Sequence, residues 1–505
     1  MDSVKIIENG FVVTCDGADR AGVMAILVKG DRIAELNPVA AGLRARYPNA
    51  EVIDASDKII LPGFVDAHYH GESFALRMWT DRIPLARWNR VAEIRLAFSY
   101  LQRTASKEEL IPMYRAAYFS ALKAGVTTIS EFGFDHLDVP FAAAREALRR
   151  SDLRGFVGIH NSEQMDHAKA DSASGPLSSL VLPAEEDLTL YGLQTTLRLA
   201  GEFKVPILSH LGETREGHEA IRRNFNRSIV RILDEFRIFH YPVQMTHGGL
   251  MSEEDLDVLA AAGIPVIVNP ASLPAKQTEP PPVGALLDRG IPLALGSDWG
   301  LPDPFENMRQ VRRMPGAEKL TSQHILRLHT LNSARALGLH HEIGSIEPGK
   351  KSDMTFVDVS APAHVLSLAS GDPERVVGSM LRDCTRASVS DVMINGDFFL
   401  RKGQVMTYAE EDLKREYREA MQGLLKAVKG KSQGPAESTL APILPLHQED
   451  VSKPEVEDGS FEEGFRIIGT TGSFPRSTEA RPGEQSRRAD ELPKTVRRTF
   501  GEDDF

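Results

Sequence analysis

The chain has very few cysteines. Only Cys15 and Cys384 occur in 505 residues, which is too few for a disulfide framework and is typical of a reduced compartment. No apolar run approaches the roughly 20 residues that a membrane-spanning helix needs. Residues 1–5 lead into a strand-like segment that lacks the pattern of a signal peptide. We therefore expect a cytoplasmic protein that does not bind a membrane.

An excess of positive charge is also lacking. The formal net charge is −12 at pH 7, whereas nucleic acids and anionic membranes both favour a basic patch on their partners. Nucleic acid is therefore not an expected partner. The hydrophobic content of 42% is ordinary for a globular protein and is sufficient for a large core.

Residues 61–70 are the most informative segment. They read Leu-Pro-Gly-Phe-Val-Asp-Ala-His-Tyr-His, a short apolar run that ends in His68 and His70. Side chains alternate along a strand, so both imidazoles would point to the same side and share one cation. Imidazole suits zinc, iron and similar divalent ions. In a chain with 15 histidines one such pair proves little alone, and the other polar clusters decide the interpretation.

Three further β-like runs end in polar residues. One leads into His210, with Glu213 three residues later, a second into His247, and a third into Asp298. Each run is short and bounded by Gly or Pro, as expected of a buried parallel strand. Polar residues that close several separate strands are typical of a (β/α)8 barrel, whose site lies at the carboxyl ends of its strands.

Together these motifs resemble the amidohydrolase superfamily, in its cytosine deaminase and chlorohydrolase-like branch. The similarity spans roughly residues 1–405 and rests on residues 62–70, His210 with Glu213, Thr-His-Gly-Gly at 246–249, Gly-Ser-Asp at 296–298, and the segments 330–339 and 343–353. No motif alone is specific, but their combination is.

The resemblance implies a (β/α)8 TIM-like barrel with a small β-sandwich built from both chain ends. The expected parts are a first half-sandwich at 1–60, the barrel at 61–345, a second half-sandwich at 346–408, a helix at 409–429 and a mostly disordered tail at 430–505. The candidate barrel strands are 64–70, 126–131, 155–160, 180–182, 205–210, 243–247, 265–269 and 292–298.

The same resemblance implies one divalent metal ion, with zinc preferred over iron or manganese. His68, His70, His210 and Asp298 would bind it, and the cation would lower the pKa of a bound water to about 7. Asp298 would also accept the first proton, Glu213 would act as general acid and base, and His247 would stabilise a developing oxyanion. No lysine follows the candidate fourth strand, where two-metal branches carry a carbamylated one, so a single metal is expected.

The residues around the substrate are less well defined. Arg77, Trp79, His160 and Trp299 are candidates for substrate contact: the tryptophans for stacking, and Arg77 for an anionic group, although a structural salt bridge suits Arg77 equally well. His160 ends a candidate strand. Residues 182–187 read Leu-Pro-Ala-Glu-Glu-Asp, where nucleoside deaminases of this branch carry a histidine. That departure puts a purine nucleoside substrate in doubt.

The expected enzyme is a hydrolase of carbon–nitrogen bonds other than peptide bonds, which attacks an sp2 carbon of a small molecule with metal-activated water. Deamination of an N-heterocycle is the leading hypothesis. Hydrolysis of a cyclic or linear amide, as in imidazolonepropionase-like relatives, and dechlorination of a heteroaryl carbon remain alternatives. A non-catalytic scaffold barrel is the distant one, since the ligand set is complete. Family members often form homo-oligomers, but the sequence does not specify an assembly.

Overall fold

The computed structural model describes residues 3–133, 137–170 and 175–431. Every element discussed below lies within these residues. The expected tail at 430–505 lies outside the described residues from 432 onward. Within the described part, no helix is both long and apolar enough to span a bilayer.

An eight-stranded parallel sheet forms the centre of the described part of the chain, in the order β15-β14-β13-β12-β11-β10-β9-β8. Its strands are β8 (Phe64–Tyr69), β9 (Val126–Glu131), β10 (Arg154–Ile159), β11 (Leu177–Val181), β12 (Ile207–Leu211), β13 (Val243–His247), β14 (Val266–Val268) and β15 (Leu293–Leu295). A bridge between Tyr69 and Asp298 brings the first and last strands together. The predicted (β/α)8 barrel is confirmed.

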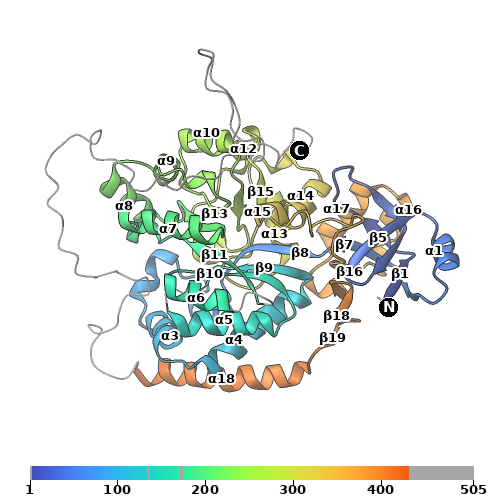
Figure 1. Cartoon of the computed structure of the whole chain (residues 1–505), viewed down its shortest axis with the longest axis horizontal. Coiled ribbons are helices and arrows are strands. Elements are labelled where there is room, and N and C mark those ends of the chain that lie inside the picture. The colour runs from blue at the N-terminus through green and yellow to red at the C-terminus, as the bar shows by residue number, and fades with distance from the viewer. Residues whose placement is uncertain (1–2, 134–136, 171–174, 432–505) are drawn as a thin grey trace, which may run out of the picture. The chain divides into compact units, whose positions relative to one another are not determined.

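Helices follow the barrel strands along the chain and surround them in Figure 1. They are α2 (Ser73–Thr80), α3 (Ala92–Arg103), α4 (Lys107–Lys123), α5 (Asp138–Arg149), α6 (Ser162–Ala170), α7 (Leu190–Phe203), α8 (Arg215–Phe225), α9 (Ile229–Glu235), α10 (Glu253–Ala262), α11 (Leu273–Lys276), α12 (Val283–Asp288), α13 (Pro304–Arg312), α14 (Ser322–Leu328) and α15 (Leu331–Ala336). Their apolar faces and the strands share one large buried core.

Both ends of the barrel segment continue into a smaller β structure. Its four-stranded sheet is ordered β5-β4-β1-β6 and its seven-stranded sheet β19-β18-β17-β16-β7-β2-β3. The strands are β1 (Val4–Glu8), β2 (Phe11–Val13), β3 (Ala21–Val23), β4 (Ala25–Lys29), β5 (Arg32–Asn37), β6 (Glu51–Asp54), β7 (Lys58–Pro62), β16 (Met354–Asp358), β17 (Val389–Ile394), β18 (Asp397–Arg401) and β19 (Gln404–Val405). Side chains of both sheets, among them Ile7, Ile26, Val12 and Phe356, share one apolar core.

The pairing of β16 with β7 joins the two ends of this β structure. Met354 lies opposite Pro62 and Asp358 opposite Lys58 in an antiparallel register. The remaining helices are α1 (Ala40–Arg46), α16 (Val365–Ser370), α17 (Pro373–Asp383) and α18 (Glu410–Lys431). Residues from both ends of the sequence therefore build the small β domain that the family resemblance implies.

Helix α18 packs against α3 and α4 on the outside of the barrel (Figure 1). Its buried residues Leu413, Ala420, Leu424 and Val428 recur at spacings of four and seven, which places them on one face of a helix. Arg115 of α4 donates to Glu416 at 2.8 Å. The last described helix is therefore held to the barrel by an apolar stripe and an ion pair.

Arg154, the first residue of β10, links the barrel to the β domain. Its guanidinium forms an ion pair with Asp353, whose side chain is 2% exposed, and donates to Asn395 Oδ1 at 2.6 Å. Asp353 also accepts from the backbone N–H of Asn395 at 2.9 Å. Removal of the arginine would leave a buried carboxylate without its cation, which costs more than the pair itself contributes.

We predict that Arg154→Met lowers the free energy of unfolding by about 3 kcal/mol, because Asp353 stays buried and unpaired. Urea denaturation monitored by circular dichroism measures this loss. Arg198→Met is the matched control: it breaks an exposed pair with Glu202 and should change stability by less than about 0.5 kcal/mol. Equal effects of the two substitutions would contradict the prediction.

Candidate functional site

The polar residues that close the strands gather at one end of the barrel. His68 lies on β8 and His70 directly after it, His210 lies on β12, and His247 is the last residue of β13. Asp298 follows β15, and its backbone pairs with that of the first strand, since its N–H donates to His68 O at 2.8 Å and its carbonyl accepts from His70 N at 3.1 Å. These strand ends form the carboxyl face, where barrel enzymes carry their sites.

The side chains converge as closely as their positions suggest. His68 Nε2 lies 3.2 Å from His210 Nε2 and 3.7 Å from Asp298 Oδ1. His70 Nε2 lies 3.6 Å from the same oxygen. Within the described residues, His68 groups with His70 and Asp298, and also with His210 and His247, with all ligand atoms of each group inside 4.8 Å.

These distances fit a divalent cation. Ligand atoms about 2.1 Å from a tetrahedral zinc ion lie about 3.4 Å from one another, close to the 3.2, 3.7 and 3.6 Å found here. Three imidazoles and one carboxylate are also the donor types that zinc and iron prefer. His68, His70, His210 and Asp298 could therefore hold one such ion.

The backbone at two of these positions is strained. His247 has φ 75° and Asp298 has φ 51°, a left-handed conformation that costs a non-glycine residue free energy and persists only when its surroundings enforce it. Just before Asp298, a Cβ on Gly296 would lie 2.8 Å from His68 Cβ. Only glycine at this position lets the last strand approach the first strand closely enough to bring Asp298 to the histidines.

Glu213 faces the same centre. Its Oε2 lies 3.5 Å from His247 Nε2 and 3.8 Å from His210 Nδ1, and its side chain is 10% exposed. Helix α8 begins only at Arg215, with Thr214 as its N-cap. Glu213 therefore lies before the helix and points into the site, instead of starting a solvated helix.

Lys276 is a site residue that sequence reasoning missed. It is 3% exposed, and its ammonium donates to Asp298 Oδ2 at 2.9 Å and Oδ1 at 3.1 Å. The same ammonium forms a short ion pair with Glu213. Lys276 is the last residue of α11, the short helix after β14. The available signal was a lone lysine among small and apolar residues at 270–275.

Burial determines the protonation of the histidines. It lowers the pKa of His68 to about 4 and lowers the pKa of His70, His210 and His247 below the usual value. The histidines are therefore neutral at pH 7, which is the form that binds a metal.

The two charged groups behave differently. Burial alone would raise the pKa of Asp298, but the Lys276 cation and the neighbouring histidines hold it well below its usual range. Burial likewise opposes the charge of Lys276, yet Asp298 and Glu213 raise the pKa of its ammonium. Asp298 and Lys276 are therefore both ionised at neutral pH.

Side chains outside the candidate ligand set contact these histidines and the backbone next to them. The ring of Phe132 stacks on that of His210, with centroids 4.2 Å apart and planes within 6°. Glu72 Oε1 lies 3.0 Å from His70 Nδ1. Glu131 accepts from the backbone N–H of Gly71 at 3.0 Å. Burial raises the pKa of both carboxyls to about 8.

The acidic segment after β11 also supports the site. Glu185 Oε1 accepts from the backbone N–H of Gly212 at 2.7 Å, and burial raises the pKa of Glu185 to about 7. This contact fixes the segment between His210 and Glu213. This acidic segment, which stands where nucleoside deaminases of the resembled branch carry a histidine, therefore has a structural contact of its own.

The four candidates for substrate contact have different surroundings. Trp299 is 7% exposed, stacks on Phe98, and its Nε1 donates to Thr80 Oγ1 at 2.9 Å. Its ring lies 5.8 Å from that of His70, so Trp299 packs beside a candidate metal ligand, which favours a packing role over an open stacking surface.

The other three candidates lie on α2 or beside β10. The Arg77 guanidinium lies 4.9 Å from the centroid of the Phe74 ring and forms no ion pair within the described residues. Trp79 is half-buried against the core. His160 directly follows β10, with its ring 5.9 Å from that of Phe132, so it is the candidate nearest to the ring that covers His210.

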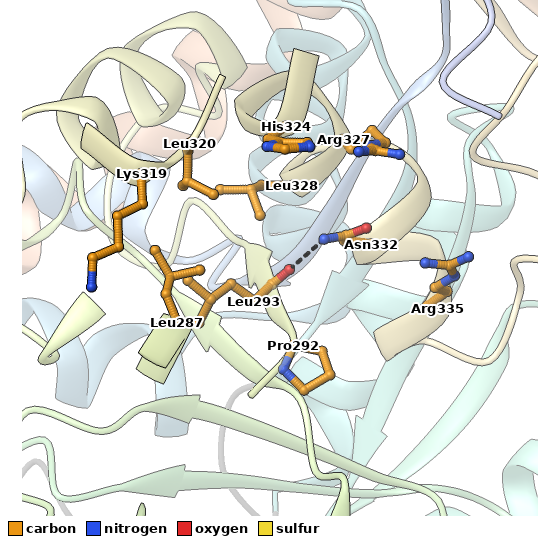
Figure 2. Close-up of a pocket in the computed structure, with 10 residues that line it drawn as sticks. All are labelled: Leu287, Pro292, Leu293, Lys319, Leu320, His324, Arg327, Leu328, Asn332 and Arg335. Carbon is orange, nitrogen blue, oxygen red and sulfur yellow. Dashed lines mark hydrogen bonds between the residues drawn. The ribbon is translucent and has the colours of Figure 1, made fainter. Parts of the chain in front are cut away.

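A separate pocket lies at the opposite end of β15 (Figure 2). Pro292 and Leu293 form part of its apolar wall, and Lys319, His324, Arg327 and Arg335 add basic groups. Arg327 pairs with Asp19 at 3.1 Å, and Lys319 pairs with Asp288. This pocket contains none of the residues that gather at the carboxyl face.

Comparisons with known proteins agree with this geometry. The Amidohydrolase family model matches residues 59–399. A 5-methylthioadenosine/S-adenosylhomocysteine deaminase from Desulforudis audaxviator is 26% identical over 443 residues, which cover 84% of this chain and 99% of that protein.

Two solved structures share the fold. An adenosine deaminase from Xanthomonas campestris with bound zinc has a TM-score of 0.73 and 22% identity, and the match covers 84% of this chain and 99% of that one. An atrazine chlorohydrolase from Arthrobacter aurescens complexed with zinc has a TM-score of 0.70 and 18% identity, over 83% and 100% of the two chains. Because the family model covers well over half of the chain, this protein is a member of the amidohydrolase family and a hydrolase of carbon–nitrogen bonds other than peptide bonds.

Proposed function

We propose that this protein is a metal-dependent aminohydrolase that deaminates a small N-heterocyclic substrate. The observation that carries the proposal is that His68 lies close both to His70 and Asp298 and to His210 and His247, with the ligand atoms of each group inside 4.8 Å. Glu213 lies 3.5 Å from His247 beside them. Curated relatives that align over most of the chain are deaminases of 5-methylthioadenosine and S-adenosylhomocysteine, which supports this reaction class.

Zinc is the metal that we propose, held by His68, His70, His210 and Asp298. When bound, a divalent cation of this kind lowers the pKa of a coordinated water and makes hydroxide available at neutral pH. Zinc-bound relatives with the same fold support this choice. The neutral imidazoles and the ionised Asp298 present the donors without a prior proton loss.

The protein's own groups then move the protons. Asp298 is ionised and accepts the proton of the attacking water. Glu213 carries a proton to the ring nitrogen or to the leaving amine of the substrate, since its Oε2 faces the centre between His210 and His247. The amide nitrogen of Asn269 lies 3.4 Å from His247 Nδ1, which places the imidazole proton on Nε2, facing the site. There it donates to the oxygen that becomes negative as the substrate carbon turns tetrahedral.

Lys276 balances the charge of these groups. Its ammonium touches both Asp298 and Glu213, and two buried carboxylates so close together would repel each other without a cation between them. It also fixes the direction of Glu213, because Oε1 is held by the ammonium and Oε2 is left to face His247.

The substrate can be found by assay. Ammonia release is measured across a panel of pyrimidines, purines, pterins and triazines, together with cyclic amides and chlorotriazines. We expect ammonia from at least one aminated heterocycle. Ring opening without ammonia would support the amide-hydrolase alternative, and chloride release would support dechlorination. Purified protein that takes up no metal, even when grown with zinc, iron or manganese, would contradict the enzyme proposal.

Glu213→Gln should keep the metal but lower kcat by about 10²–10⁴-fold, because it removes the proton carrier alone. Metal content and steady-state kinetics measure the two effects. Glu219→Gln, an exposed change on the same segment, should behave like the unmodified protein. His68→Ala should lose both metal and activity. Near-normal turnover in Glu213→Gln would overturn its assigned role.

Lys276→Met should destabilise the metal-free protein by about 3 kcal/mol, because Asp298 and Glu213 lose their shared cation. Zinc should then raise the melting temperature more in this variant than in the unmodified protein, since the ion restores positive charge beside Asp298. Scanning calorimetry with and without zinc tests this. Lys426→Met, at an exposed position, serves as the control. A zinc-induced shift no larger than that of the unmodified protein would contradict the charge-balancing role.

A further inference from the structure

We propose that Glu72 is a positioning residue that orients His70 for metal binding. The inference rests on the proposed metal site and extends it to a residue outside the ligand set. Oε1 of the Glu72 carboxyl group accepts the Nδ1–H of His70 and thereby leaves the lone pair of Nε2 directed at the other ligands.

The two nitrogens of the His70 ring face different groups. Nδ1 lies 3.0 Å from Glu72 Oε1, and Nε2 lies 3.6 Å from Asp298 Oδ1. In a neutral imidazole one nitrogen carries the proton and the other the lone pair. Oε1 of Glu72 can accept a hydrogen bond whether or not the other carboxyl oxygen carries a proton, so the contact fits the tautomer protonated on Nδ1. That tautomer presents Nε2 as the metal ligand.

A role in capping the following helix does not explain the position of Glu72. This residue is the N-cap of α2, but its side chain makes no hydrogen bond to the first turn of the helix. Within the described residues it also has no lysine or arginine partner, and its Oε2 has no hydrogen bond. A buried carboxylate is costly, so the contact with His70 is the interaction that accounts for its burial.

A second buried carboxylate fixes the turn that aims Glu72. Both oxygens of Glu131 accept from the N–H of Gly71 at 3.0 Å, and Oε2 also accepts from the Tyr118 hydroxyl at 3.1 Å. A Cβ on Gly71 would lie 2.7 Å from Glu131 Oε2 and 2.6 Å from Tyr114 Cδ1. The peptide between His70 and Glu72 is therefore held in place from the strand next to β8.

The other metal-binding histidines lack an equivalent support. His68 Nδ1 has no hydrogen-bond partner within the described residues. His210 Nδ1 is 3.8 Å from Glu213 Oε2, which is too long for a hydrogen bond. Among the three imidazoles, only His70 has its Nδ1 within hydrogen-bond distance of a carboxyl oxygen in this part of the chain. We therefore expect Glu72 to contribute to metal affinity through His70.

The test uses full-length protein stripped of metal and titrated with zinc against a chelator of known affinity. Glu72→Ala should raise the Kd for zinc by about 10–100-fold. Glu72→Gln should raise it less, since its amide oxygen can still accept the Nδ1–H. The thermal midpoint of the metal-free Glu72→Ala protein should be equal to or higher than that of the unmodified protein, because a buried carboxyl group without a cationic partner is gone.

Glu8→Gln is the matched control. Glu8 is also a buried carboxylate, but it pairs with Arg44 in the β domain, far along the chain from the ligands. We expect it to lower stability slightly and to leave zinc affinity unchanged. If Glu72 acted in folding alone, Glu72→Ala would lower the thermal midpoint of the metal-free protein and leave the Kd for zinc unchanged. That result would overturn the proposal.

The outcomes separate this inference from the proposed function. A Kd for Glu72→Ala within twofold of the unmodified protein overturns the role of Glu72 and leaves the hydrolase proposal intact. If Glu72→Ala weakens zinc binding as expected but the unmodified protein releases no ammonia, chloride or ring-opened product, the proposed function is overturned and the role of Glu72 stays intact. Unmodified protein that binds no zinc overturns both.

Discussion

The site depends on the closure of the barrel between its first and last strands. The backbone of Asp298 donates to His68 and accepts from His70, so one pair of hydrogen bonds both completes the ring of strands and brings a carboxylate to two imidazoles. Gly296 permits this approach, because a side chain there would collide with His68. Asp298 and His247 adopt a left-handed backbone conformation, which raises their conformational free energy but directs their side chains from separate strands into the site.

Charge within this closed end is arranged in layers. Neutral imidazoles lie at the centre, Lys276 joins Asp298 to Glu213 beside them, and Glu72 and Glu131 lie behind His70. Asp298 and Glu213 in the centre share the Lys276 cation, whereas the carboxyl groups behind interact with uncharged donors. A metal ion bound there would contact the ionised Asp298 and the Nε2 of His70, whose Nδ1 is hydrogen-bonded to Glu72.

Much of this arrangement could be predicted from the sequence, because strand periodicity and polar strand ends are local features. All of the expected barrel strands exist, although β14 and β15 are shorter than predicted. β15 is short because the chain leaves the ladder at Gly296 to bring Asp298 inward. Lys276 was missed because it lies on α11, well past its strand, where only tertiary packing directs the side chain inward. The packing of Trp299 against Phe98 likewise depends on a helix distant in sequence, which no local pattern reveals.

The pairing of β7 with β16 has a consequence for the order in which the protein matures. β7 runs through Gly63 directly into β8, and Gly63 itself donates to Asp353 O at 2.9 Å. During translation, the candidate ligands His68, His70, His210 and Asp298 are all made before β16, the strand that pairs with β7 just ahead of His68 and His70. Domains generally fold as units as they leave the ribosome, but here β8 can pair with β9 early, whereas the pairing of β7 with β16 cannot be complete until translation has passed residue 358.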